Sequence, residues 1–245
     1  MNTLDKLQEC WLVNLGQAKY LEVLDLQRRL VELRQQNLVP DTLLLVEHEP
    51  VITLGRLGRA DNILSTAEEL ASQGIQIQRV ERGGDVTYHG PGQLVGYPII
   101  HLTQRKLSLS TYVHMLEETL IQTLEDFDIR AGHEPQHRGV WVEDLKVAAL
   151  GVAIRRWVSF HGFALNVSPN LDHYCHINPC DLGHEQVTSM ASLLGEPVSM
   201  AEVTSKLLSS FIELLPGEWR TLSADELLRE IAIDEEIYHL RSIQG

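Results

Sequence analysis

The sequence predicts an α+β protein in which helices flank a mixed β-sheet. Segments with helical spacing of apolar residues are interleaved with short apolar or alternating segments that are typical of strands. The 245 residues are enough to bury a full core. Because the chain contains no internal repeat and no low-complexity linker, we expect a single domain that spans residues 1–245.

The first half of the chain is predicted to begin with a helix and to continue as strands. Residues 17–38 carry apolar side chains at roughly helical spacing. Short apolar runs at 42–46 and 51–54 indicate buried strands, and residues 75–80 alternate with period two, as a half-buried strand does. After a glycine-rich block, residues 94–100 return to strand character.

The second half is predicted to hold three more helices. Residues 110–127 form one apolar stripe, and we expect Ser110 to cap this helix. Capping boxes, in which a serine precedes a glutamate by three residues, start the other two helices at Ser199 and Ser223.

Between these helices lie three strand-like segments, at 140–142, 145–154 and 158–167. Short polar connections separate them, which favours an antiparallel meander. The turn at Glu143 and Asp144 lacks the glycine that a tight hairpin prefers, so the pattern leaves its register open.

The composition excludes several classes of protein. A formal net charge of −14 argues against general binding of nucleic acid, which requires a basic face. No apolar run approaches the roughly 20 residues of a membrane-spanning helix, and the first residues lack the pattern of a secretory signal. Three cysteines, an odd number, argue against a disulfide framework. We therefore expect a cytoplasmic protein that needs no membrane.

Cys180 is the first candidate for chemistry. A cysteine becomes a nucleophile as its thiolate, which needs a nearby positive charge or a helix N-terminus. The segment 177–183 reads as a turn in which a thiol can stay accessible. The alternative is a structural thiol, because free cysteine is among the most buried residue types. Cys10 and Cys175 lack this context, and we interpret them as structural.

Lys146 strengthens the case for a reactive thiol. It lies in the segment 145–154, which is otherwise apolar on both faces, and a lysine is costly to bury there unless it is paired or functional. If Lys146 lies against Cys180, its ammonium group stabilises the thiolate, and its neutral amine can accept a proton. The alternative to a functional role is that Lys146 lies on an edge strand, where its charge prevents aggregation, or that only the aliphatic part of its side chain is buried.

A glycine-rich block spans residues 82–93 and contains four glycines and Pro91. Such a block lets backbone amides approach a carbonyl or a phosphate closely. Its spacing fits neither a P-loop nor a dinucleotide fingerprint, and a purely structural turn is the alternative. Within it, His89 could donate to a developing oxyanion or shuttle a proton, or it could be a satisfied structural histidine.

A metal site has little support in the sequence. The candidate ligands are His173, Cys175, His176, Cys180 and His184. Their spacing matches no standard zinc finger, and no paired C-x-x-C motif is present. We expect no metal and no cofactor.

Taken together, these blocks resemble the octanoyltransferases of lipoate synthesis. The segment 82–93 is similar to that family's signature almost letter for letter. Further matching blocks follow in the family's order and spacing: Glu47 to Gly55, Gly139 to Val142, Lys146 to Gly151, His161 to Asn166, and Asn178 to Cys180. The resemblance runs from about residue 42 to 190, and residues 216–245 form a C-terminal extension to which it gives no role.

The resemblance implies a fold shared with biotin and lipoate protein ligases and a reaction that needs no nucleotide. In that reaction an octanoyl group moves from octanoyl-acyl carrier protein to a lysine of a lipoyl domain, in the 2-oxoacid dehydrogenase complexes or in the glycine cleavage H protein. By the family's pattern, Cys180 carries the acyl group as a thioester, and Lys146 lowers the pKa of Cys180 and acts as general base. The positions that the pattern assigns to substrate binding are Arg82, Gly83, Gly84, Asp85, Val86, Thr87, Tyr88, His89, Ala149, Leu150, Gly151, Gly162, Phe163 and Ala164.

One departure and three alternatives remain. The family usually has glycine directly after the cysteine, whereas Asp181 follows here, and a carboxylate beside a thiolate opposes its ionisation. The first alternative is an ATP-dependent lipoate or biotin ligase, which needs an adenylate site. The second is a cysteine hydrolase with His89 or His161 as base. The third is a protein that binds lipoyl domains without turnover.

Overall fold

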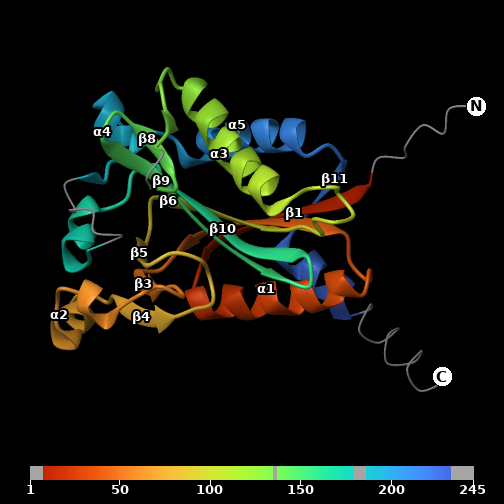
Figure 1. Ribbon diagram of the computed structural model, residues 1–245, viewed down its shortest axis with the longest axis horizontal. Coiled ribbons are helices and arrows are strands. Elements are labelled where there is room, and N and C mark those ends of the chain that lie inside the picture. The colour runs from red at the N-terminus through yellow and green to blue at the C-terminus, as the bar shows by residue number, and fades with distance from the viewer. Residues whose placement is uncertain (1–7, 135–136, 179–185, 233–245) are drawn as a thin grey trace, which may run out of the picture.

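The computed structural model describes residues 8–134, 137–178 and 186–232, and within these ranges an eight-stranded mixed sheet runs through the protein (Figure 1). In sheet order its strands are β11 (Glu218–Leu222), β1 (Glu9–Ala18), β2 (Asp41–His48), β6 (Gln93–Ile99), β10 (Val158–Asn166), β9 (Leu145–Arg155), β8 (Val140–Val142) and β7 (Gly132–His133). The first three pair in parallel and the rest in antiparallel fashion.

Helices cover both faces of this sheet (Figure 1). Helices α3 (Leu109–Glu125) and α5 (Met200–Leu214) lie on one face, with the short α4 (Met190–Leu194) near their end. Helix α1 (Tyr20–Gln35) lies on the other face. Each face has its own apolar cluster, which includes Leu120 and Phe211 on the first side and Leu30 and Val31 on the second. The apolar stripes of the helices thus make a three-layer arrangement.

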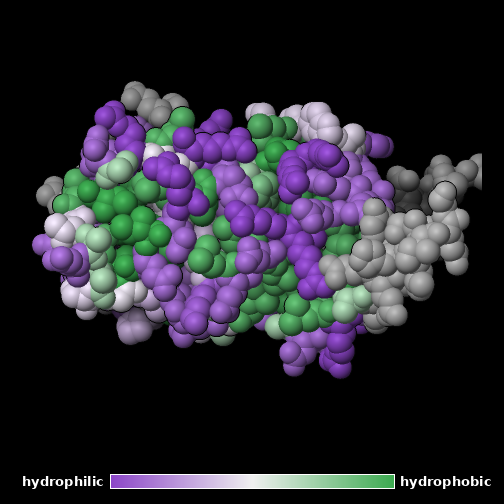
Figure 2. Space-filling model, turned by 90° about the horizontal axis from the view of Figure 1, so that it is seen from below, coloured by the Kyte–Doolittle hydropathy of each residue, from purple (hydrophilic) through white to green (hydrophobic). Residues whose placement is uncertain are grey.

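A smaller sheet lies beside the main one and carries the glycine-rich block. Its strands, in order, are β4 (Gln76–Arg79), β3 (Val51–Leu54) and β5 (Val86–His89). The short helices α2 (Ala67–Ser72), η1 (Ala60–Asn62) and η2 (Leu171–His176) complete this region. Viewed from below, the molecule presents apolar surface interspersed with polar side chains (Figure 2). Leu57 and Leu64, in the connection after β3, are 74% and 61% exposed.

Most predicted elements are confirmed with shifted ends. The predicted helix at 17–38 is α1, which begins only at Tyr20 because residues 17 and 18 complete β1. The predicted meander is confirmed as β8, β9 and β10. The capping box at Ser223 is confirmed by both of its hydrogen bonds with Glu226, before a helical segment at 224–232, whereas Ser199 caps α5 through the single bond that it accepts from the amide of Glu202.

Two predictions were wrong in detail. Helix α3 is capped by Ser108, whose hydroxyl accepts a hydrogen bond from the amide of Thr111, and Ser110 lies within the first turn. The strand at 75–80 is present as β4, but Ile77 is 39% exposed rather than buried. The reason is that β4 is an edge strand of the small sheet. The buried side chains of this segment are those of Ile75 and Val80, which flank β4.

The described part of the C-terminal extension adds a strand to the main sheet. Strand β11 pairs in parallel with β1, with Glu218 opposite Glu9. In the helical segment that follows, Leu227 and Ile231 are fully buried in the cluster that α1 covers. Residues 218–231 therefore extend the sheet by one strand and add to its core. Among the described residues, no helix is both long and apolar enough to cross a bilayer.

Candidate active site

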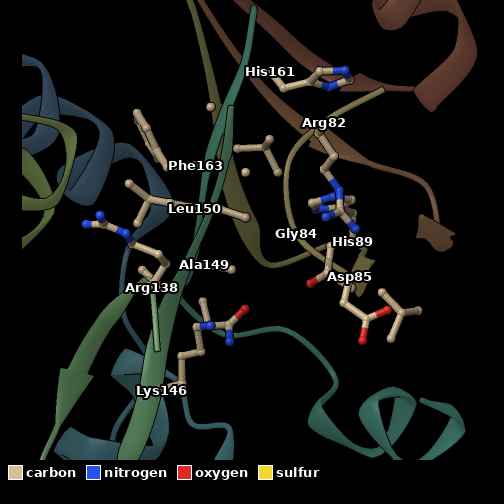
Figure 3. Close-up of a pocket in the computed structure, with 18 of the residues that line it drawn as sticks. Arg82, Gly84, Asp85, His89, Arg138, Lys146, Ala149, Leu150, His161 and Phe163 are labelled. Carbon is tan, nitrogen blue, oxygen red and sulfur yellow. The ribbon is translucent and has the colours of Figure 1, made fainter. Parts of the chain in front are cut away.

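A pocket of about 300 Å³ lies between the glycine-rich block and strands β6, β9 and β10 (Figure 3). Of the residues predicted to bind substrate, those that line it are Arg82, Gly84, Asp85, Val86, Thr87, His89, Ala149, Leu150, Gly151, Gly162, Phe163 and Ala164. Lys146 lines it as well. The sequence motifs, which are up to 80 residues apart in the chain, thus meet at one cavity.

The floor of the pocket is made of small residues on paired strands. In the register of β9 and β10, Ala149 lies opposite Ala164 and Gly151 lies opposite Gly162. A Cβ atom on Gly151 would lie 3.1 Å from Arg82 Cδ, so glycine lets the loop cross β9 closely. The alternation of glycine and alanine leaves an apolar space between the sheet and the loop.

Arg82 fixes the glycine-rich loop to the small sheet. Its Nη2 donates to the carbonyl oxygen of Thr53 at 2.7 Å, and its Nε and Nη2 donate to Thr53 Oγ1 at 3.1 and 2.9 Å. The amide of Gly83 donates to the carbonyl of Val152 on β9 at 2.9 Å, so this loop amide is already occupied. Arg82 thus positions the loop from a buried site.

Asp85 connects the loop to the segment that precedes Cys180. Its Oδ2 accepts a hydrogen bond from Asn62 Nδ2, and its Oδ1 has no partner among the described residues. The carbonyl of Asn62 accepts from the amide of Asn178 at 2.8 Å. Asp85 therefore brings a carboxylate oxygen to the pocket close to where the chain enters residues 179–185.

His89 is held as a neutral imidazole. Its Nδ1 lies 2.7 Å from Gln93 Oε1, and Gln93 Nε2 donates to Asn166 Oδ1 at 2.9 Å. Because this second bond orients the Gln93 amide, the proton of His89 sits on Nδ1 and leaves Nε2 as an acceptor. Burial, with a contribution from nearby His48, lowers the pKa of His89 to about 3. This tautomer suits Nε2 of His89 to accept a hydrogen bond and not to donate one to an oxyanion, and the lowered pKa makes the ring a weak base.

Lys146 lies at the start of β9, at the opposite end of the pocket from His161 (Figure 3). Its carbonyl accepts from the amide of Thr188 at 3.0 Å, and its Nζ lies 5.4 Å from the centroid of the Trp141 ring. That distance is within the range of a cation–π interaction. A Cβ atom on Gly139 would lie only 2.5 Å from Lys146 Cε, so the lysine side chain occupies the space that this glycine leaves.

Cys180, with Asp181, lies outside the described residues, and so do Gly183 and His184. The chain on both sides of this segment is described. Asn178 contacts Asn62, the partner of Asp85, and Val187 lines the pocket and pairs with Lys146. Both flanks of the segment that carries Cys180 therefore lie at the Lys146 end of the pocket.

Two predicted binding residues do not line the pocket. The side chain of Tyr88 lies on the other side of β5, where its hydroxyl is 2.7 Å from His173 Nδ1 and its ring contacts Tyr174. Gly83 faces Val152 through its amide. Strand alternation explains why Tyr88 does not line the pocket, because the neighbouring side chains of Thr87 and His89 point to the opposite face of β5.

Several pocket residues are not among those that the sequence assigned to substrate binding, and of these His161 had been considered only as the base of a hydrolase. Beyond the predicted set, polar and aromatic side chains contribute from Tyr20, Tyr97, His137, Arg138, His161, Asn166 and Tyr174. His161 and Asn166 stand in a block that had been singled out, and strand alternation there could have indicated them. Tyr20 and Tyr97 carry no motif, and only the packing of α1 against β6 brings them to the site.

Two of the residues considered for zinc, His173 and His176, have other partners. His173 Nδ1 contacts the Tyr88 hydroxyl, and His176 contacts Ser65 Oγ and Gln73 Oε1 at 2.7 and 3.1 Å. Within the described ranges, the group whose donor atoms lie close enough to share an ion is instead His114, Glu118 and His133, on α3 and β7. These residues contact one another, with His133 Nε2 at 2.9 Å from Glu118 Oε1.

Comparison with known proteins gives a consistent result. Residues 19–212 match the family model of the lipoyl protein ligase A/B catalytic domain. An octanoyltransferase of Desulforamulus reducens is 43% identical over 222 residues, which are 90% of this chain and 97% of that protein. An octanoyltransferase of Syntrophobacter fumaroxidans is 44% identical over 221 residues, again 90% of this chain and 97% of that protein.

A solved structure supports the fold. A lipoate-protein ligase A bound with ATP superimposes with a TM-score of 0.75 over 94% of each chain, at 18% identity. At that identity the likeness concerns the fold alone, and it confirms the ligase-like fold that the sequence predicts. The match to the relatives covers all the motifs that meet at the pocket. The chain therefore belongs to the lipoyl protein ligase A/B catalytic domain family and, within it, to the octanoyltransferases, which are acyltransferases.

Proposed function

We propose that the protein carries an octanoyl group from octanoyl-acyl carrier protein to a lysine of a lipoyl domain, through a thioester on Cys180, in the cytoplasm. The observation that carries this proposal is the pocket itself. It is floored by Ala149, Gly151 and Gly162, it has Lys146 and Asp85 at one end, and the chain enters and leaves the Cys180 segment at that same end.

In the first half-reaction, the Cys180 thiolate attacks the carbonyl carbon of the carrier thioester. A new C–S bond forms, the bond to the carrier sulfur breaks, and the carrier thiolate leaves and takes a proton from the ammonium group of Lys146, whose amine is then neutral. One thioester replaces another, so this exchange needs no nucleotide. The ammonium group of Lys146 is proposed to stabilise the Cys180 thiolate at this stage.

In the second half-reaction, the amine of the target lysine attacks the octanoyl-Cys180 thioester. A C–N bond forms as the C–S bond breaks, and Cys180 leaves as its thiolate. The neutral amine of Lys146 takes the proton that the target amine loses. Conversion of a thioester to an amide is downhill, which drives the cycle forward. Backbone amides of the glycine-rich loop other than that of Gly83 are proposed to hold the oxyanion.

The acceptor is proposed to be a lipoyl domain of a 2-oxoacid dehydrogenase complex or the glycine cleavage H protein. Support comes from the relatives that are named octanoyltransferases and from a structure of similar fold, titled as a bi-partite lipoate protein ligase with its E2 lipoyl domain. The second candidate is an ATP-dependent ligase, because the fold is also that of a ligase bound with ATP.

Intact mass separates these functions. The protein is mixed with octanoyl-acyl carrier protein without ATP, next to Cys180→Ala and next to Cys175→Ala, in which an exposed thiol is removed instead. We expect an octanoyl adduct that hydroxylamine removes in the wild type and in Cys175→Ala, and none in Cys180→Ala. Transfer that occurs only with ATP and free octanoate assigns the protein to the ligases. Release of free acid without an acceptor assigns it to the hydrolases.

A further inference from the structure

The end of the pocket that lies opposite Lys146 is formed by a histidine (Figure 3). His161 lines the pocket from β10, next to Gly162, and pairs with Val152 on β9. From Lys146 towards His161 the floor is made by Ala149 and Gly151 on β9, so an apolar channel leads to an imidazole. A polar side chain at this end of a largely apolar pocket needs an explanation.

His161 has unused hydrogen-bonding capacity. Its side chain belongs to a residue that is only 1% exposed, yet neither ring nitrogen has a hydrogen-bond partner among the described residues. Its ring stacks on Phe160 at 4.9 Å between centroids and meets Tyr97 edge-on at 6.3 Å. Burial lowers the pKa of His161 to about 3, so the ring is neutral at physiological pH.

Gln27 on α1 supports His161 from behind. Its Oε1 accepts a hydrogen bond from the His161 amide at 2.8 Å, and its Nε2 is also without a partner among the described residues. Gln27 is fully buried. The two ring nitrogens of a pocket-lining residue thus have no partner among the described residues, with the unpartnered Gln27 Nε2 on a neighbouring buried side chain, and buried polar atoms of this kind are rare.

The backbone at His161 is strained as well. Its φ of +52° lies in the left-handed region, which a residue with a Cβ atom seldom adopts within a strand. The surrounding strand β10 is buried throughout, so the packing holds this conformation in place. Strain of this kind persists where a side chain must be presented in one orientation, and here it presents the ring to the pocket.

We propose that His161, held by Gln27, ends the acyl channel and sets the longest acyl chain that the enzyme accepts. This inference rests on the proposed function and names the specificity residue of that site. An acyl chain that ends before it reaches the His161 ring leaves the ring nitrogens free to bind water. A longer acyl chain presses methylene groups against the two ring nitrogens of His161, and the cost of leaving these buried polar atoms without a hydrogen-bond partner disfavours that chain.

The test is a comparison of acyl carrier proteins that bear octanoyl, decanoyl and dodecanoyl groups. The quantity measured is kcat/KM for dodecanoyl transfer relative to octanoyl transfer. His161→Gly removes the ring that ends the channel, so we expect this ratio to rise at least about tenfold. Glycine also adopts the left-handed backbone of this position without strain. The matched control is Trp157→Gly, which relieves another left-handed residue (φ +69°) at an exposed turn and is expected to leave the ratio unchanged.

His161→Asn provides a second variant that keeps a polar group and tolerates left-handed backbone. We expect His161→Asn to raise the ratio less than His161→Gly does. If His161→Gly does not fold, His161→Asn alone tests whether His161 limits the length of the acyl chain. An unchanged ratio in a folded, active His161 variant overturns the inference and leaves the proposed function intact. A wild-type protein that transfers no acyl group of any length overturns the proposed function instead.

Discussion

The side chain of Lys146 passes directly over Gly139: a Cβ atom at position 139 would lie 2.5 Å from Lys146 Cε and 3.3 Å from its Nζ. Gly139 also has a φ of +133°, which side chains other than glycine's adopt poorly. The position of the Lys146 side chain therefore depends on Gly139, which has no side chain and directly precedes β8.

Gly139→Ala is expected to displace Lys146 and to lower kcat/KM for octanoyl transfer by about 100-fold, because misplacing a reacting group by 1 Å has an effect of that order. Steady-state kinetics next to circular dichroism would separate misplacement from unfolding. Gly132→Ala is the matched control, since a Cβ atom there meets nothing within 4 Å. Wild-type kinetics in Gly139→Ala would contradict the placement of Lys146.

Thr53→Val tests how Arg82 holds the loop. The substitution keeps the shape of the side chain and removes the hydroxyl that accepts from Arg82 Nε and Nη2. We expect the free energy of unfolding to fall by about 1–3 kcal/mol, as for a buried charged donor that loses its acceptor, and KM for the acyl donor to rise. Urea unfolding and kinetics measure the two effects.

The control for Thr53→Val is Thr123→Val. Thr123 is equally buried, but its hydroxyl bonds to the carbonyl of Thr119 one helical turn earlier, far from the loop. KM should stay at the wild-type value in this variant. If both variants change KM alike, Arg82 is not what positions the loop.

Stability is expected to fall as the pH drops below about 6.5. Burial lowers the pKa of His48 to about 4 and those of His89 and His161 to about 3. Between those values and 6.5 the unfolded chain binds protons that the folded protein does not, so acid favours unfolding. Each histidine contributes up to about 1.4 kcal/mol per pH unit in this window.

Urea unfolding at several values between about pH 7 and 5 measures this slope. His89→Gln should reduce it by close to one proton, whereas His114→Gln, which changes an exposed ring, should leave it unchanged. A slope that is the same in both variants would mean that His89 is not buried in its neutral form.

Leu227→Ala tests the contribution of the C-terminal extension. Leu227 is fully buried against the main sheet, so its truncation is expected to lower the free energy of unfolding by about 2–5 kcal/mol. Leu228→Ala changes the neighbouring side chain, which is 48% exposed, and should change stability by no more than about 0.5 kcal/mol. Equal effects would show that residues 224–232 do not pack as described.

The sequence predicted those parts of the molecule in which local pattern and structure agree. The meander of β8, β9 and β10 follows from apolar segments joined by short polar turns, and the glycine-rich block lies at the pocket because only glycine permits so close an approach. Strand β5 was hidden inside that block, since the five residues between Gly84 and Gly90 give too short a pattern to predict a strand.

Other features could not be predicted because they depend on distant packing. Tyr20 and Tyr97 reach the pocket only through the contact of α1 with the sheet. The left-handed backbone of His161 leaves no trace in a segment that reads as an ordinary strand. Strand β1 combines a four-residue apolar run with a register shift between Asn14 and Gln17, which obscures its period.

The pairing of β1 with β11 has a consequence for synthesis of the protein. Because Glu9 lies opposite Glu218, one edge of β1 stays open until residue 218, about 200 residues later, has been made. At about 5–20 residues per second, this interval is on the order of ten seconds or more. An open strand edge is a template for pairing with other chains. The nascent protein therefore carries an aggregation-prone edge that β11 closes, and a chain that stalls before residue 218 keeps that edge exposed.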